Sequence, residues 1–92
     1  MYNFKKKRIL QNLKEKYDWH FSFVEHVMLS CNTLAQLENA RDWAGNYCDR
    51  NRTFEQIDTD FDEYLVIDDY FDGKRDIIVE HYYRKREELL DF

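Results

Sequence analysis

The sequence predicts a compact all-α domain of four to five helices, and three observations support this prediction. The chain has 92 residues, which is the length of one domain. It contains no proline and only two glycines, which argues against turn-rich β-sandwiches and long linkers. Apolar residues recur at helical spacing along most of the chain. We therefore expect residues 1–92 to form a single helical domain.

Two helices are expected in the first third of the chain, one on each side of Asp18. Asn3 is a candidate cap for the first helix and Asp18 for the second. The apolar stripe of the first consists of Ile9, Leu10, Leu13 and Tyr17, and that of the second of Phe21, Val24 and Met28.

A third helix is expected to begin after Thr33, because Thr33-Leu34-Ala35-Gln36 has the pattern of a capping box. Its apolar positions continue to Cys48. A fourth helix is expected after Thr53, where the segment 53–56 has the same pattern.

Gly73 is a natural stop for this fourth helix, and a last helix is expected from about Ile78 to Leu90. An alternative for this region is a short β-hairpin across residues 64–80. Asp72-Gly73 is a hairpin-type dipeptide, and it lies between two β-favouring apolar runs.

Residues 58–73, DTDFDEYLVIDDYFDG, combine negative charge with apolar side chains. Seven of these sixteen positions are carboxylates, and nearly all the others are aromatic or aliphatic. In one continuous helix Glu55, Asp58, Asp62 and Asp69 would lie within about 60° of one another around the axis. Like charges at this spacing destabilise a helix by about 0.2–0.5 kcal/mol per pair. Fold stability alone does not select this arrangement, and such breaches of local rules are typical of functional sites.

Several roles are open to these carboxylates. They can form a solvated face that keeps an apolar domain soluble, and some of the aspartates can serve as turn or cap residues. Asp58, Asp60 and Asp62 copy the first ligands of an EF-hand loop, but Glu63 stands where that loop needs glycine. The chain has no Gly-rich phosphate loop and no nucleophile motif. We therefore expect no catalytic residue, no metal site, no cofactor and no enzyme activity.

The two halves of the chain differ in charge. Residues 1–53 carry nine Lys and Arg against six Asp and Glu, whereas residues 54–92 carry five against thirteen. The acidic half argues against direct nucleic-acid binding and for a basic protein partner. The basic cluster Lys5–Arg8 is either a solvated start or a partner for the acidic half, within the chain or between subunits.

Two cysteines, no signal peptide and no apolar run of about 18 residues favour a cytoplasmic protein without a membrane segment.

A binding function in which carboxylates imitate DNA phosphates uses both unusual features of the acidic run. A DNA-binding protein supplies Lys and Arg to the phosphates, and spaced carboxylates on a rigid body can occupy the same cleft. Exposed aromatic residues would add contact area. The candidate phosphate mimics are Glu55, Asp58, Asp62, Glu63, Asp68, Asp69 and Asp72.

In size and in this acidic, aromatic run the chain resembles the phage-encoded DNA-mimic anti-restriction proteins, in particular the T-even type that inhibits a restriction endonuclease. The resemblance implies a non-enzymatic inhibitor that is acidic on one face, forms a homodimer and acts on a restriction nuclease or other DNA-binding protein in the host cytoplasm. An alternative is a helical protein–protein interaction module, such as an anti-CRISPR-type inhibitor, that docks through aromatic residues.

Overall fold

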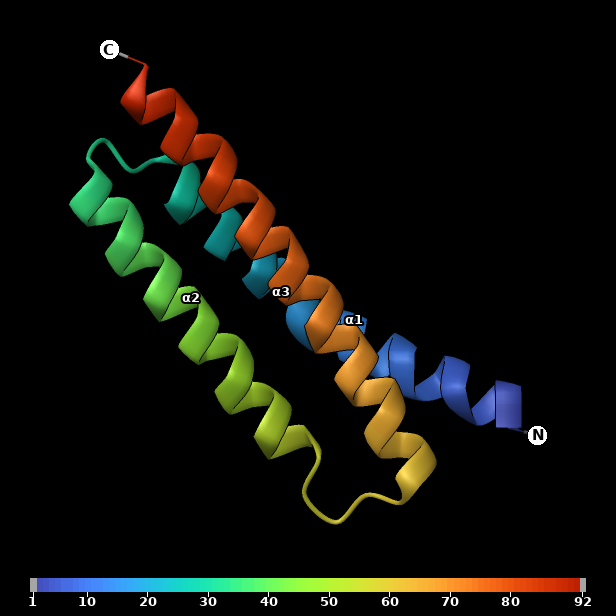
Figure 1. Cartoon of the computed structure of the whole chain (residues 1–92). Helices are drawn as coiled ribbons and strands as arrows, with labels where there is room; N and C mark the ends of the chain where they lie inside the picture. The colour runs from blue at the N-terminus through green and yellow to red at the C-terminus, as the bar shows by residue number, and fades with distance from the viewer. Residues whose placement is uncertain (1, 92) are drawn as a thin grey trace.

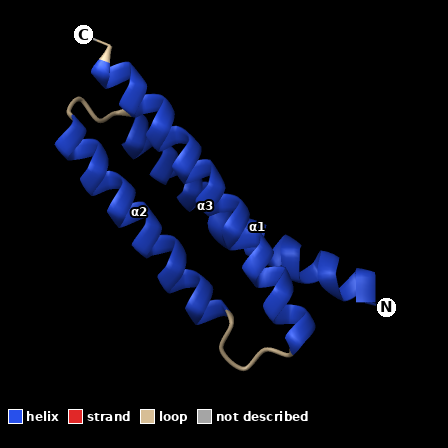
Figure 2. Ribbon diagram, in the orientation of Figure 1, coloured by secondary structure: helices blue, strands red, loops and turns tan. Residues whose placement is uncertain are grey.

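The computed structural model describes residues 2–91 and shows three long α-helices (Figures 1 and 2). Helix α1 spans Tyr2–Leu29, α2 spans Leu34–Glu55 and α3 spans Phe61–Leu90. The all-α prediction is confirmed. The β-hairpin considered for residues 64–80 is wrong, because that whole segment lies within α3. The helices are fewer than four to five because two of the expected breaks do not occur.

Helix α1 is continuous where a break was expected. Its buried positions form one stripe with helical spacing that runs past Asp18, so packing favours a single helix. These residues are Leu13, Tyr17, Phe21, Val24 and Met28. Asp18 lies inside α1, and its carboxylate reaches α3 instead of capping a helix.

Helix α2 begins as predicted and ends later than predicted. The Thr33 side chain accepts a hydrogen bond from the Gln36 backbone N–H at 3.1 Å, so this cap is confirmed. The Gln36 side chain in turn accepts one from the Asn32 N–H at 2.9 Å. The start expected after Thr53 is wrong, because α2 continues to Glu55, whose side chain packs against α1.

Helix α3 begins at a cap that was not predicted and passes through a residue expected to end it. Asp60 caps the helix, since its side chain accepts a hydrogen bond from the Glu63 N–H at 2.8 Å. Gly73 lies in the helix interior, because the buried positions continue beyond it to Ile78 and Tyr82.

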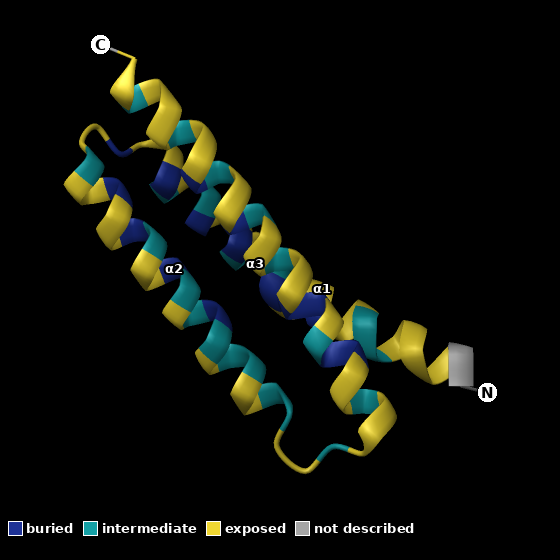
Figure 3. Ribbon diagram, viewed as in Figure 1, coloured by how far each residue is buried: buried dark blue, intermediate teal, exposed yellow. Residues whose placement is uncertain are grey.

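The helices form a thin bundle with principal-axis extents of 54 × 19 × 17 Å. Figure 1 shows α2 and α3 running in opposite directions beside each other, with α1 crossing behind α3. Helix α3 contacts both other helices more extensively than α1 and α2 contact each other. The buried residues therefore gather on the inner sides of the three helices, and the outer sides are exposed (Figure 3).

The centre of the core is aromatic. Phe71 of α3 is fully buried, and its ring lies 5.2 Å from the Tyr17 ring and 6.1 Å from the Phe21 ring of α1. From α2, the Cys48 thiol donates a hydrogen bond to the Phe71 carbonyl at 3.3 Å. Burial raises the pKa of Cys48 to about 11, so this thiol stays protonated and packs as a small apolar group. All three helices thus meet at Phe71.

Candidate functional site

The acidic run does not form the single carboxylate stripe that the sequence predicted. Glu55 is the last residue of α2, Asp58 lies in the connection 56–60, and Asp62 and Asp69 belong to α3. The chain reverses direction between α2 and α3, so these four side chains are not on one helix face. The predicted site is therefore divided into carboxylates that bind within the chain and carboxylates that point to solvent.

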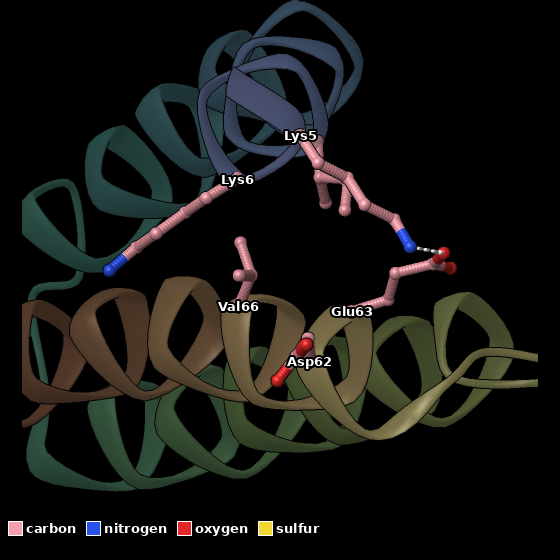
Figure 4. Close-up of a pocket in the computed structure, with 6 residues that line it drawn as sticks. Lys5, Lys6, Asp62, Glu63 and Val66 are labelled. Atoms are coloured by element: carbon pink, nitrogen blue, oxygen red, sulfur yellow. Dashed lines mark ion pairs between the residues drawn. The ribbon is translucent and has the colours of Figure 1, made fainter. Parts of the chain in front are cut away.

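Glu55 and Glu63 are tied to α1. Glu55 accepts hydrogen bonds from Lys16 Nζ at 2.6 Å and from the Tyr17 hydroxyl at 2.5 Å. Burial and this hydrogen bond raise the pKa of Tyr17, which therefore remains a donor to Glu55. Lys5 Nζ lies 3.0 Å from Glu63 across the space between α1 and α3, as Figure 4 shows. Within the basic cluster, Lys5 thus pairs with the acidic half of the same chain, whereas Lys6, Lys7 and Arg8 form no ion pair with the described residues.

Asp68 and Asp72 are tied to α2 through one guanidinium. The Arg52 side chain lies 3.7 Å from Asp68 and 3.2 Å from Asp72, and it also reaches Asp49 at 3.2 Å. Asp49 pairs in addition with Arg75 of α3. The charges of Asp68 and Asp72 are thus used to hold α2 against α3.

Asp58, Asp62 and Asp69 remain without a cation partner in the part of the chain whose side chains are described, residues 4–91. All three are exposed. Asp62 and Asp69 are seven residues apart, which places them on the same side of α3 at a separation of about 10.5 Å. In Figure 4 Asp62 extends from α3 beside the Lys5–Glu63 pair without joining it.

Asp76 is a further exposed carboxylate that sequence reasoning missed. It lies seven residues after Asp69 and so continues the line of Asp62 and Asp69 along α3, again without a cation partner in the described chain. The signal that could have found it is the seven-residue repeat of aspartates at 62, 69 and 76, which extends beyond the acidic run.

Exposed large apolar side chains lie near the free carboxylates in the sequence. Phe61 is 74% exposed, Ile57 61% and Leu65 40%. These residues alternate with the acids at the connection between α2 and α3 and in the first turns of α3. We call this surface the acidic patch, and it consists of Ile57, Asp58, Phe61, Asp62, Leu65 and Asp69.

Asp58 has a backbone conformation that is uncommon for a residue with a side chain. Its φ is +57°, in the left-handed region, which Asp and Asn visit more readily than other non-glycine residues. Glycine would adopt this conformation without strain. A carboxylate therefore occupies a position that glycine would occupy without backbone strain.

The helical backbone of α3 is incompatible with an EF-hand loop in this segment. That loop needs a flexible segment of twelve residues, whereas the chain is helical from Phe61 onward. Asp60 is occupied as the helix cap and pairs with Lys5 at 2.6 Å, which lowers the pKa of Asp60. Within the described residues, no group of three or more His, Cys, Asp or Glu side chains could hold a metal ion.

Comparison of the chain with protein-family models, with curated proteins and with solved structures gave no match. None of the three helices described here has an apolar stretch of the length that a bilayer crossing requires.

Proposed function

We propose that this protein is a non-enzymatic, phage-type inhibitor that binds a basic DNA-binding protein of a bacterial host, such as a restriction nuclease, at its DNA-binding surface. The observation that supports this proposal is that some carboxylates of the predicted site form ion pairs within the chain and others do not. Four of the seven candidate carboxylates, Glu55, Glu63, Asp68 and Asp72, form ion pairs within the chain, whereas Asp58, Asp62 and Asp69 are exposed and without a cation partner in the described residues. Their charges are available to lysine and arginine side chains of another protein.

The spacing of the free carboxylates limits how much of a duplex they can imitate. Duplex DNA carries one negative charge per roughly 1.7 Å of axis. Asp62, Asp69 and Asp76 supply one charge per roughly 10.5 Å along α3. We therefore infer that the imitation is local, so that the acidic patch occupies a few phosphate-binding side chains instead of filling a long cleft.

The exposed apolar residues of the patch supply the remaining contact. Aromatic side chains are enriched at the centres of protein interfaces and are frequent hot spots of binding energy. Phe61 is the most exposed apolar member of the patch and follows the helix cap Asp60 at the start of α3. In this proposal Phe61 anchors the complex and the carboxylates set its specificity and its rate of association.

The test is capture of bacterial DNA-binding proteins on the immobilised protein, with duplex DNA as competitor. The variant Asp58→Asn/Asp62→Lys/Asp69→Lys removes the free charge at 58 and reverses those at 62 and 69, and Asn is used at 58 because it tolerates the left-handed backbone. We expect the wild type to retain a partner that duplex DNA or moderate salt releases, and the variant to lose it.

The matched control is Glu15→Gln/Glu38→Lys/Asp42→Lys, which changes the net charge by the same amount at exposed positions on α1 and α2. Far-UV circular dichroism shows whether both variants keep their helices. Retention of the partner by a folded triple variant of the patch, or its loss by the control as well, contradicts the proposal.

A second candidate function is a helical interaction module that docks through apolar contact, and the exposure of Phe61, Ile57 and Leu65 favours it. Salt separates the two candidates, because charge-driven binding weakens with ionic strength and apolar docking does not. Phe61→Ser should abolish binding in the second case while the charge variant keeps it.

A further inference from the structure

One side of α3 is covered by neither of the other helices. In Figure 1 α1 lies behind α3 and α2 lies beside it, and exposed residues recur along the side of α3 that faces the viewer (Figure 3). Nine exposed residues of α3 follow one another in alternating steps of three and four positions. We call them the outer seam, and they are Asp62, Leu65, Asp69, Asp72, Asp76, Val79, Tyr83, Arg86 and Leu90.

The spacing of the outer seam is that of a helix–helix contact. Steps of three and four keep a line of side chains on one side of a helix over several turns, and they are the repeat of helices that pack along each other. On the opposite side of α3, Ile67, Phe71, Ile78 and Tyr82 follow in steps of four and seven within the core shared with α1 and α2. The outer seam thus has the pattern of a second such contact, but no helix of the described chain lies against it.

The acidic residues of the outer seam require a partner that carries positive charge. Asp62, Asp69 and Asp76 have no cation partner within the described residues, whereas Asp72 lies 3.2 Å from Arg52. Covering a carboxylate takes it out of water, which is unfavourable unless a cation or a hydrogen-bond donor pairs with it. The three free carboxylates are about 10.5 Å apart along α3, which equals two turns of an α-helix. Lysine or arginine at seven-residue intervals on a second helix would therefore meet each of them.

Apolar residues of the outer seam lie on both sides of its most acidic part, residues 69–76. Leu65 precedes this part, and Val79, Tyr83 and Leu90 follow it. Val79 is 43% exposed and Tyr83 58%. Such side chains gain from contact with aliphatic side chains, which a uniformly charged helix does not offer. The pattern therefore favours a partner helix that is both basic and amphipathic.

We propose that a basic, amphipathic α-helix of the partner protein packs along the outer seam. Its lysine or arginine residues, seven positions apart, pair with Asp62, Asp69 and Asp76, and its aliphatic residues cover Val79 and Tyr83. The inference rests on the proposed function, because it takes the partner to be a basic DNA-binding protein. It adds the element through which this partner is held, and it extends the binding surface from the acidic patch to the C-terminal half of α3.

The charge of the outer seam disfavours a second copy of this chain as its occupant. A twofold contact would place the aspartates of one seam beside those of the other, and like charges repel. A helix that contacts DNA has the opposite charge, because its lysine and arginine side chains bind phosphates. Such a helix, once packed along α3, would be unable to enter a groove of DNA.

The test uses a synthetic helical peptide as the probe and the full chain as the receptor. The peptide has lysine at three positions seven residues apart, leucine three residues after each lysine, and alanine and glutamine elsewhere. The control peptide has the same composition but lysines five residues apart, so that they lie on different sides of its helix. Fluorescence anisotropy of the labelled peptides should show that the first binds at least about tenfold more tightly than the second.

Two charge variants show whether the peptide binds at the outer seam. Asp69→Asn/Asp76→Asn removes two of its free charges and should weaken binding by about tenfold or more, because two lysines of the peptide lose their partners. The matched control is Glu15→Gln/Glu38→Gln, which removes two exposed charges from α1 and α2. It changes the net charge by the same amount and should leave the affinity nearly unaltered.

Two apolar variants test the contact at the C-terminal half of α3. Tyr83→Ser removes an exposed ring from the outer seam and should weaken binding of the peptide severalfold. Phe23→Ser removes a ring of similar exposure from α1 and should not weaken it. Circular dichroism checks that the charge variants and the apolar variants all keep their helices.

Equal binding of the two peptides would show attraction by net charge alone and would overturn the proposal, as would full affinity in folded Asp69→Asn/Asp76→Asn. Either result is distinct from failure of the proposed function. If the immobilised protein captures a DNA-binding protein but does not prefer the seven-residue peptide, the proposed function stands and another element holds the partner. If it prefers that peptide, loses it in the charge variant and captures no DNA-binding protein, the outer seam binds basic helices and only the proposed DNA-binding partner is wrong.

Discussion

At the scale of single residues, polar groups on buried tyrosines connect the helices. The Tyr70 hydroxyl donates a hydrogen bond to Asp18 at 2.6 Å, and Lys74 Nζ lies 3.0 Å from the same carboxylate. Burial and the bond to Asp18 raise the pKa of Tyr70. For Asp18, partial burial acts to raise the pKa, but the bonds from Tyr70 and Lys74 outweigh it and lower the pKa. The ionised form of Asp18 is therefore the one that stabilises the fold.

Replacing Asp18 with Asn should lower the free energy of unfolding by about 1 kcal/mol at neutral pH, which is the difference between a charged and a neutral acceptor for the Tyr70 hydroxyl. An aspartate whose pKa is lowered by folding stabilises the protein above its unfolded pKa of about 4. This stabilisation is lost as the pH falls through the lower pKa of the folded state.

Urea unfolding of the wild type and Asp18→Asn at a series of pH values measures this effect. The difference between them should be constant near neutrality and should shrink below about pH 4. Asp76→Asn, which removes an exposed carboxylate without an ion pair in the described chain, is the control and should change little. An Asp18→Asn difference that persists unchanged in acid would show that Asp18 does not act through its charge.

A second prediction concerns Asp58, because its φ of +57° is strained for a residue other than glycine. Asp58→Gly should raise the free energy of unfolding, or leave it unchanged, whereas Asp58→Ala should lower it by about 1 kcal/mol. The midpoints of urea unfolding measure both. If glycine strongly destabilises the protein, the carboxylate has a structural role and the case for Asp58 as a binding residue weakens.

At the scale of helices, the spacing of apolar residues predicted the all-α class, and a capping box predicted the N-cap of α2. These patterns did not predict every helix boundary. Thr33 was identified because its capping box has no competitor nearby. Near residues 53–63 the sequence contains two such patterns, one from Thr53 and one from Asp60, and only the second is used. The choice depends on Glu55 packing against Tyr17, a contact between residues far apart in sequence. Sequence spacing within one segment does not show such a contact.

The prediction that a helix ends at Gly73 was wrong for a related reason. A glycine in a helix interior costs about 1 kcal/mol relative to alanine, and the apolar stripe that continues to Ile78 and Tyr82 outweighs this cost. A helix stop at glycine is favoured when the glycine adopts a positive φ, and Gly73 does not. Packing of the whole helix therefore decides its length.

Gly73→Ala tests the continuity of α3. A Cβ at this position would meet no other atom within 4 Å, so alanine should stabilise the protein by about 0.5–1 kcal/mol and raise the melting temperature by several degrees. Gly45→Ala in α2 is the matched control, with the same open space, and should give a similar gain. A loss of stability at Gly73 alone would indicate that the helix is interrupted there.

At the scale of the whole molecule, the sequence identified the candidate carboxylates but not which of them are free. Their partners come from distant parts of the chain. Lys5 reaches Glu63, Lys16 reaches Glu55 and Arg52 reaches Asp72. Only the arrangement of three helices shows that these pairs form, and it leaves Asp58, Asp62 and Asp69 exposed. The same arrangement brings Trp19 of α1 and Trp43 of α2 into one series of rings through His20 and Tyr47, which spacing within one helix does not show.

Because the three helices share a core at Phe71, we can predict how substitutions at this residue affect unfolding of the bundle. Phe71→Ala should cost about 3–5 kcal/mol, a large part of the total of about 5–15 kcal/mol expected for a domain, so the variant is at risk of unfolding. Phe71→Leu keeps most of the volume and should cost about 1–2 kcal/mol while the protein remains folded. Because α1, α2 and α3 all contact Phe71, its loss should weaken the three helices together.

Native-state hydrogen exchange of Phe71→Leu measures this coupling residue by residue. The most protected amides of all three helices should lose the same opening free energy, as expected when they exchange through one global unfolding event. The control is Ile9→Ala, which truncates a half-buried side chain near the N-terminal end of α1 and should increase exchange there without weakening α2. If α1 keeps its protection in Phe71→Leu while α2 and α3 lose theirs, then α2 and α3 form the stable unit. In that case α1 would be able to separate from it.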